Sequence, residues 1–136
     1  TAANLILEDV EVNVTGTQAG AGNICCLGVE IEGLWTGSTI RNVRINEAIT
    51  GAVNYSQRGL ALGLFESSQF DGIIEGLKLT SMSDAKSTGI YIGSTSNLTI
   101  SKMMEIKQCD LSAAYTKLYF AAPSNASKVQ LTNLIG

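Results

Sequence analysis

The 136-residue sequence predicts an all-β solenoid, in which short parallel strands from successive repeats stack on one another. Three observations carry this prediction. A seven-residue motif recurs along the chain, a second strand-like segment recurs between its copies, and equivalent positions of the copies share their polarity. A period between about 20 and 50 residues is typical of stacked units, none of which buries its apolar face alone.

The recurring motif has the pattern apolar, two polar, apolar, polar, apolar, and its clearest copy spans residues 40–46. Its copies begin at Leu7, Ile40, Ile74, Ile106 and Leu131, so successive spacings are 33, 34, 32 and 25 residues. Two adjacent polar residues interrupt the alternation of a strand, so we expect a bend there. The bend slot holds Asp9, Asn42, Gly76, Gln108 and Asn133. Four of these five are residue types that tolerate the left-handed backbone conformation of a bend.

The second recurring segment begins at Gly28, Gly59, Gly89 and, less closely, Lys117. Apolar and polar residues alternate in it, which predicts one inward and one outward face. Together with the two strands of the motif, it predicts three short strands in each repeat of roughly 31 residues. No helix is expected, although a short helical turn around residues 112–116 is compatible with the sequence.

Stacking in register would place equivalent residues about 4.8 Å apart on neighbouring strands. The predicted inner columns are apolar throughout: Leu7, Ile40, Ile74, Ile106 and Leu131; Val10, Val43, Leu77, Cys109 and Leu134; Val29, Leu60, Ile90 and Leu118; Ile31, Leu62, Ile92 and Phe120. The outer columns carry charges, mostly of alternating sign: Glu8, Arg41, Glu75, Lys107 and Thr132; Glu11, Arg44, Lys78 and Asp110. Opposite charges on neighbouring strands stabilise the pairing, so the outer columns support the same register.

Three parallel strands per repeat, an Asn-type bend and inward aliphatic ladders resemble the right-handed parallel β-helix of the pectin-lyase-like superfamily. The resemblance covers residues 1–136 and implies a single β-helix domain of about 4–5 coils. Because the sequence opens on Thr1 and stops within a repeat at Gly136, we interpret it as a fragment of a longer chain. A left-handed hexapeptide helix would need a six-residue period, and a leucine-rich repeat would need helical returns; the sequence has neither.

The superfamily contains pectate lyases, polygalacturonases, epimerases and the trimeric tailspikes and tail fibres by which bacteriophages bind or cut surface polysaccharides. The chain has no His, so the Gly-His-Gly pattern of polygalacturonases is absent, and we find no match to the acidic calcium cluster of pectate lyases. The resemblance is therefore closest to a tailspike or tail fibre. It implies a rigid, extracellular or virion-surface segment that contacts bacterial surface polysaccharide as a homotrimer, with no cofactor and no metal.

Composition excludes two other classes of partner. Nine Lys and Arg are scattered among twelve Asp and Glu, for a net charge of −3, so no basic stripe for nucleic acid is expected. Apolar runs are too short to span a bilayer, and membrane insertion is not expected. Cys25, Cys26 and Cys109 form an odd set without metal-ligand spacing, which predicts reduced packing residues.

The best candidate site is the outward face of the second segment, where two columns lie side by side: Glu30, Ala61, Tyr91 and Tyr119; Glu32, Gly63, Gly93 and Ala121. Small residues beside aromatic ones predict a shallow groove, in which Tyr91 and Tyr119 would stack on sugar rings and Glu30 would bind hydroxyl groups. Glycoside hydrolysis uses two carboxylates about 5–10 Å apart. The candidate catalytic acids are Glu30, Glu32 and Glu66, with Asp71 beside Glu66 in a second possible pair.

Each candidate has a structural alternative. Tyr91 and Tyr119 would equally form a ladder that covers the coil or a contact between subunits, and Glu66 and Asp71 would flank a solvated turn. Trp35 and Phe65, which follow the same strand in neighbouring repeats, are expected to stack on each other. Three functions therefore stay open: a polysaccharide-contacting scaffold, a polysaccharide hydrolase or lyase, and a purely structural interaction module.

Overall fold

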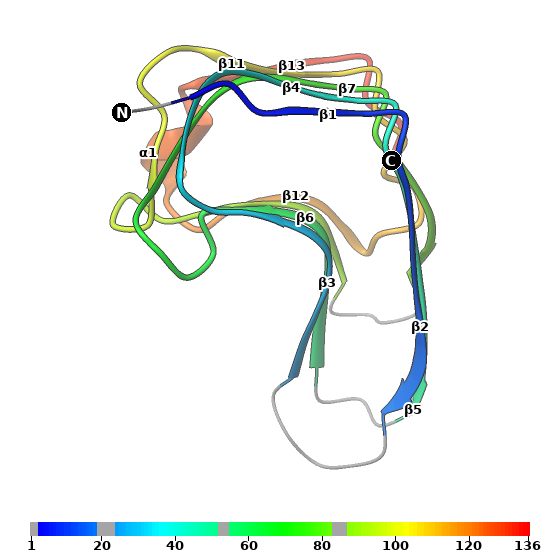
Figure 1. Ribbon diagram of the computed structural model, residues 1–136. Coiled ribbons are helices and arrows are strands. Elements are labelled where there is room, and N and C mark those ends of the chain that lie inside the picture. Colours follow the sequence, from blue (N-terminus) through cyan, green and yellow to red (C-terminus); the bar gives the residue numbers. More distant parts are fainter. Residues whose placement is uncertain (1–2, 19–23, 52–54, 83–86) are drawn as a thin grey trace.

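The computed structural model describes residues 3–18, 24–51, 55–82 and 87–136, with the backbone alone at 17–18, 24–27, 50–51 and 55–56. The described chain is all-β apart from one helical turn, and its strands pair in parallel in three sheets (Figure 1). Because every pairing joins strands from successive repeats, the prediction of stacked parallel strands is confirmed. The arrangement is compatible with a β-helix.

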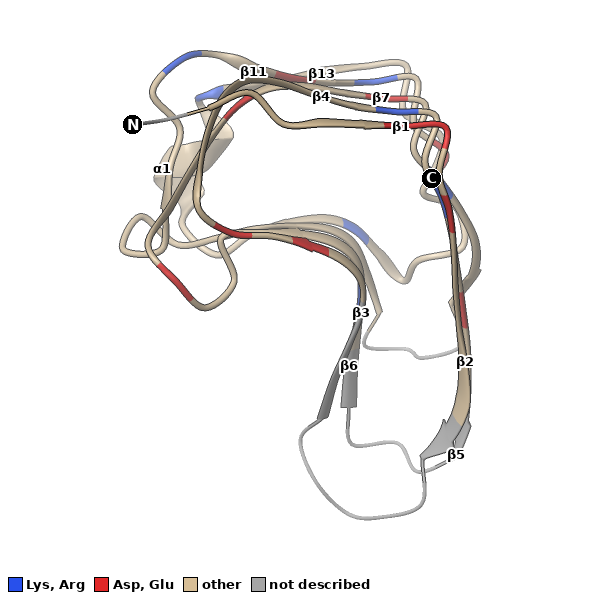
Figure 2. Ribbon diagram, in the orientation of Figure 1, with Lys and Arg blue, Asp and Glu red and all other residues tan. Residues whose placement is uncertain are grey.

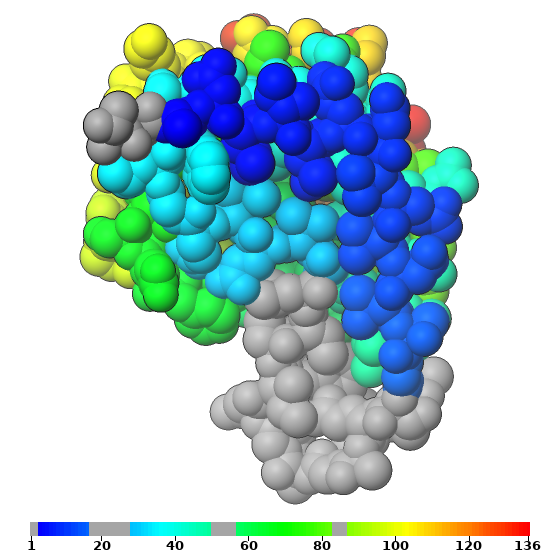
Figure 3. Space-filling model, viewed as in Figure 1, coloured from blue at the N-terminus to red at the C-terminus, as the bar shows by residue number. Residues whose placement is uncertain are grey.

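The chain passes through the three sheets in turn and then returns to the first (Figure 1). Sheet A contains β1 (Ile6–Glu8), β4 (Leu34–Arg41), β7 (Ser68–Glu75), β11 (Met104–Lys107) and β13 (Val129–Thr132) in that order, with β10 (Leu98–Thr99) also paired to β7. Sheet B contains β2 (Glu11–Gln18), β5 (Arg44–Gly51) and β8 (Lys78–Met82). Sheet C contains β3 (Ile24–Ile31), β6 (Tyr55–Leu62), β9 (Thr88–Ile92) and β12 (Thr116–Phe120). Strands β1 and β2 form the front of the stack, as the space-filling view shows (Figure 3).

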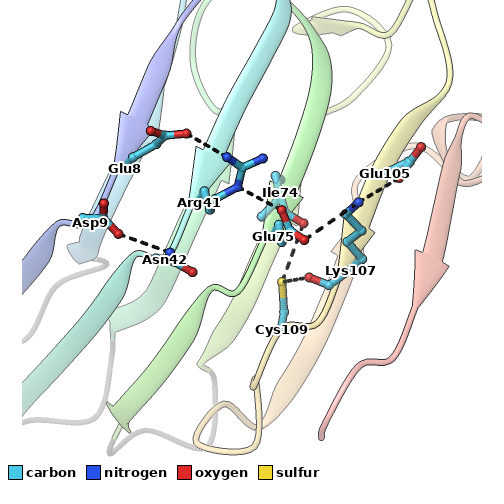
Figure 4. A network of polar contacts seen from close by, with 9 residues as sticks. All are labelled: Glu8, Asp9, Arg41, Asn42, Ile74, Glu75, Glu105, Lys107 and Cys109. Carbon is cyan, nitrogen blue, oxygen red and sulfur yellow. Dashed lines mark hydrogen bonds and ion pairs between the residues drawn. The ribbon is translucent and has the colours of Figure 1, made fainter.

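The bend predicted inside the repeated motif is present in all five copies. Asp9, Asn42, Gln108 and Asn133 have φ between 53° and 55°, and Gly76 has φ of 67°. These residues turn the chain from sheet A toward sheet B. The Asn42 side chain also donates from Nδ2 to Oδ1 of Asp9 in the preceding repeat, at 3.2 Å (Figure 4). The bend slot therefore contributes both the turn and a contact between repeats.

The predicted inner columns of sheets A and C are in register and supply most of the core, whereas Leu131 in the last repeat is 48% exposed. The pairs Leu7↔Ile40, Ile40↔Ile74, Ile74↔Ile106 and Ile106↔Leu131 run through sheet A, and the columns of sheet C pair in the same way. Cys109 continues a column as a buried free thiol whose Sγ lies 3.3 Å from the Lys107 carbonyl oxygen. Burial raises the pKa of this thiol, which suits a packing role. The side chains of Cys25 and Cys26 lie outside the described residues.

The first outer charge column forms a chain of ion pairs along sheet A. Arg41 contacts Glu8 at 3.1 Å on one side and Glu75 at 2.9 Å on the other, and Lys107 lies 3.9 Å from Glu75 (Figure 4). Figure 2 shows the resulting alternation of acidic and basic segments on neighbouring strands. Exposed pairs of this kind add little to stability. Their effect is on register, since a one-residue slip would separate every pair.

Sheet C bends where the second segment begins. Leu27 pairs with Arg58 and Val29 with Leu60, so Gly28 and Gly59 occupy equivalent positions in an unshifted register. A Cβ at Gly28 would lie 2.4 Å from Cγ2 of Ile45, so the glycine lets this strand approach sheet B closely. Arg58, which comes just before Gly59, lies beside the tyrosine column.

The structure also contains a one-turn helix, α1 (Pro123–Ala126), that the sequence analysis did not predict. Its Asn125 is buried and donates from Nδ2 to the Gly93 carbonyl oxygen at 2.9 Å, which holds the turn against sheet C. Around residues 112–116 the chain makes a turn, with the Ala114 N–H donating to the Leu111 carbonyl oxygen at 3.0 Å. Within the described ranges, no helix has the length and apolar character needed to cross a membrane.

Candidate functional site

The column of candidate ligand-binding residues lies in register on the outer face of sheet C. Glu30 pairs with Ala61, Ala61 with Tyr91, and Tyr91 with Tyr119. The Tyr91 and Tyr119 rings are stacked, with centroids 5.6 Å apart and planes 23° apart. Arg58 places its Cζ 4.5 Å from the centroid of the Tyr91 ring, a cation–π contact.

Strand order makes the two tyrosines unequal. Strand β9 lies between β6 and β12, so Tyr91 is held between Arg58 on one side and Tyr119 on the other. The Tyr91 side chain is half-buried, whereas Tyr119 is 49% exposed. Of the two rings, Tyr119 thus offers the larger open surface, and Tyr91 packs against it.

Glu32 serves as an acceptor at the corner between sheets C and A. Its Oε1 accepts hydrogen bonds from the N–H groups of Leu64 and Phe65 at 2.7 and 3.0 Å, and its Oε2 accepts from Oγ of Ser68 at 2.6 Å. Burial alone would raise the pKa of Glu32, but these hydrogen bonds outweigh it and lower the pKa below its usual value of 4.5. Glu32 is therefore ionised, and it ties one repeat to the next.

Glu30 has the opposite protonation behaviour. Partial burial, a side-chain hydrogen bond to Glu32 and the negative charges of Glu32 and Glu66 raise its pKa, while the positive charge of Arg58 lowers it by less. The two adjacent carboxyl groups therefore behave as a coupled pair, in which Glu30 is the member that keeps its proton longer. Neighbouring carboxyl groups with separated pKa values are the arrangement that acid–base catalysis uses.

Asp71 lies in a different part of the molecule, on β7 of sheet A. It is 2% exposed, and its Oδ1 accepts from the N–H groups of Ser101 and Lys102, each at 2.8 Å. Its Oδ2 accepts from Oγ of Ser101 at 2.6 Å and from Nε2 of Gln69 at 3.1 Å. Glu66 is exposed in the preceding turn, and no described contact joins it to Asp71. Asp71 thus braces neighbouring repeats and is already saturated with donors.

A hollow of about 420 Å³ opens beside Asp71, where β4 and β7 lose their regular pairing. Two residues of β4, Thr36 and Gly37, lie opposite a single residue of β7, Asp71. This two-against-one pairing is a β-bulge. The hollow is lined by Asn4, Thr36, Gly37, Asp71, Gly72, Ile73, Lys102, Met103 and Glu105. The sequence analysis missed it because repeat spacing does not report an extra residue in one strand.

Glu47 on β5 is a second feature that the sequence analysis missed. It is fully buried, and neither carboxylate oxygen has a hydrogen-bond partner in the described chain. The signal was present: Glu47 lies two residues after Ile45 and two before Ile49, at the position where strand alternation predicts an inward side chain. A charged residue type at that position was not recognised as buried.

The predicted stacking of Trp35 on Phe65 is wrong. Trp35 belongs to β4 of sheet A, where it pairs in register with Phe70, and its Nε1 donates to the Glu32 carbonyl oxygen at 2.6 Å. Phe65 lies in the turn between β6 and β7 and is 65% exposed. The two aromatic residues are separated because the corner after β6 is longer than the corner after β3.

Comparison with known proteins adds no relative: no family model, no curated protein and no solved structure matches the chain. In the described part of the chain, no three His, Cys, Asp or Glu side chains gather closely enough to hold a metal ion. What the site does is therefore argued from its own geometry.

Proposed function

We propose that this chain is a segment of a right-handed parallel β-helix of about four to five coils, in a bacteriophage tailspike, tail fibre or comparable extracellular surface protein. Its role is to present a rigid face to bacterial surface polysaccharide. Parallel pairing across three sheets supports the architecture. In Figure 1 the chain runs clockwise from β1 through β2 to β3 while receding from the viewer, which supports the right-handed sense.

The observation that carries the polysaccharide proposal is the ordered stack of Arg58, Tyr91 and Tyr119 on the outer face of sheet C. A tyrosine ring offers a flat apolar surface and a hydroxyl group, which match the C–H face and the hydroxyl groups of a sugar ring. Support from Tyr91 holds the Tyr119 ring in place before a ligand arrives, which reduces the entropy lost on binding. Glu30, on the same column, is a further hydrogen-bonding group for a glycan chain that follows the column.

Tyr119→Ala should weaken retention of the chain on its polysaccharide by about three- to tenfold, because one aromatic contact is lost. The measurement is retention on a panel of immobilised bacterial polysaccharides. Tyr115→Ala is the matched control, since Tyr115 is 73% exposed in a turn outside the column. Equal retention of the two variants would place any glycan contact away from Tyr119, and retention of neither variant nor the parent chain on any polysaccharide would favour a purely structural module.

The alternative function is a polysaccharide hydrolase or lyase, and the coupled carboxyl groups of Glu30 and Glu32 favour it. In that case Glu30 would be the proton donor to the glycosidic oxygen. The same panel separates the two functions when the products are analysed. New reducing ends or unsaturated products that Glu30→Gln abolishes would establish an enzyme, whereas binding without products would exclude one for this segment.

We further propose that the chain assembles as a homotrimer. Several apolar side chains on the outside of the stack are half or more exposed and suit a subunit contact: Ile6, Leu34, Phe65 and Met103. Light scattering should give three times the monomer mass, and Leu34→Glu should reduce it toward the monomer by placing a charge in the contact. A parent chain that stays monomeric at high concentration would contradict the trimer without affecting the glycan experiment.

A further inference from the structure

Glu47 lies in a lobe of the molecule where sheets B and C face each other. We define this lobe as the described ends of four strands: residues 14–18 of β2, 45–51 of β5, 24–28 of β3 and 55–59 of β6. Figure 1 shows β2 and β5 along one wall and β3 and β6 along the other. The wall strands are paired within their own sheets, and the side chains of Ile45 and Glu47 on β5 reach across to Gly28 on β3.

The carboxyl group of Glu47 is enclosed between these walls without a satisfied hydrogen bond. Its side chain is 0% exposed, and both oxygens lack a partner in the described chain. The space that a Cβ on Gly28 would occupy is 2.9 Å from Oε1 of Glu47, so the carboxyl group reaches across to β3. On the β6 wall, Nε2 of Gln57 donates to the Glu47 backbone carbonyl oxygen at 3.0 Å.

The described surroundings of Glu47 provide no compensating charge. Its register partners are Val14 on β2 and Met82 on β8, and Gly28 and Gln57 face it from β3 and β6. Burial raises the pKa of Glu47 to about 8, and the nearby Gly28 N–H offsets only part of that rise. A buried carboxylate without a partner is far more costly than a buried neutral carboxyl group. The closed lobe therefore favours the neutral form.

We propose that Glu47 makes the lobe responsive to pH, so that the walls stay closed while its carboxyl group is neutral and separate when it ionises. The direction in which pH shifts the opening equilibrium follows from proton binding. In an open lobe Glu47 meets water and loses its proton near its usual pKa of 4.5, whereas in the closed lobe it holds the proton up to a pKa of about 8. Between these values the open state binds fewer protons, so the equilibrium for opening rises tenfold per pH unit. The opening equilibrium is independent of pH below about pH 4.5 and above about pH 8.

Amide hydrogen exchange, corrected for the pH dependence of intrinsic exchange, tests this proposal between about pH 5 and about pH 9. Protection factors in residues 44–49 should fall tenfold per pH unit up to about pH 8 and then level off. Residues 104–107 of β11 lie outside the lobe and should show no such slope. Glu47→Gln should remove the slope, because a neutral amide replaces the ionisable group at the same size. Glu75→Gln, at a half-buried ion pair outside the lobe, should keep it.

Three results would overturn the proposal. The first is an NMR titration of the Glu47 side-chain carboxyl carbon in the parent chain that gives a pKa near 4.5. The second is a slope of equal size in residues 104–107, which would indicate unfolding of the whole chain. The third is a slope that persists in folded Glu47→Gln. If that variant does not fold, the NMR titration and the comparison of segments in the parent chain still decide the question.

Discussion

Asp71→Ala is expected to lower the free energy of unfolding by about 3–5 kcal/mol, because a buried carboxylate and its hydrogen bonds are lost together. The substitution leaves the N–H groups of Ser101 and Lys102 without their acceptor, at the corner that leads into β11. A buried donor without a partner costs more than the hydrogen bond itself contributes. Urea unfolding at neutral pH measures the effect. Glu66→Ala is the matched control and should change stability by less than about 0.5 kcal/mol, since Glu66 is exposed in the turn that precedes β7.

The same carboxylate predicts a pH dependence of the opposite sign to that of Glu47. Burial alone would raise the pKa of Asp71, but hydrogen bonds from Ser101, Lys102 and Gln69 outweigh it and lower the pKa below its usual 3.8. Its stabilising effect is therefore complete above about pH 4 and is lost as pH falls through the lowered value. The difference between the parent chain and Asp71→Ala should shrink in acid. Equal stability of Asp71→Ala and Glu66→Ala at neutral pH would contradict the bracing role.

Gly72→Ala is expected to destabilise the chain by about 3–5 kcal/mol through overlap and backbone strain combined. A Cβ at this position would lie 2.0 Å from the Ser38 carbonyl oxygen, and φ is 154°, which L side chains rarely adopt. The contact is to backbone, so no rotamer change relieves it. The cause is the bulge in β4, which pushes Ser38 against Gly72.

Gly16→Ala provides the comparison for Gly72→Ala. Gly16 lies in β2, and a Cβ there would lie 4.0 Å from Cδ1 of Ile49, which is ordinary van der Waals contact. This substitution should be neutral or stabilising by up to about 1 kcal/mol, because alanine restricts the unfolded chain. Both variants are measured by thermal and urea unfolding. Similar stabilities for the two would mean that the close approach at Ser38 is absent.

The repeats were predictable because they depend on local and periodic properties. Apolar residues at Ile40 and its equivalents mark the inward face, and Asn42 marks a bend whose left-handed backbone few residue types tolerate. The charges of Glu8 and Arg41 then indicated which residues become neighbours. Register in stacked repeats follows directly from equivalence of position, so the repeat spacing alone predicts which residues share a column.

The candidate site was predictable only in part. The column of Glu30, Tyr91 and Tyr119 follows from register, and the structure places these residues in that order. What register does not reveal is the contribution of Arg58, whose guanidinium group packs over the Tyr91 ring. The pattern likewise does not reveal that Glu32 is tied to Leu64, Phe65 and Ser68 rather than open to a ligand.

By itself, the sequence determined that this protein is a stack of parallel strands and which residues face its interior, since both properties repeat with the chain. Tertiary structure alone decided the exceptions to the repeat. Corner lengths separated Trp35 from Phe65, one extra residue in β4 opened the hollow beside Asp71, and packing of two walls enclosed Glu47. Each exception depends on how segments distant along the chain meet, and a period read along one strand does not contain that information.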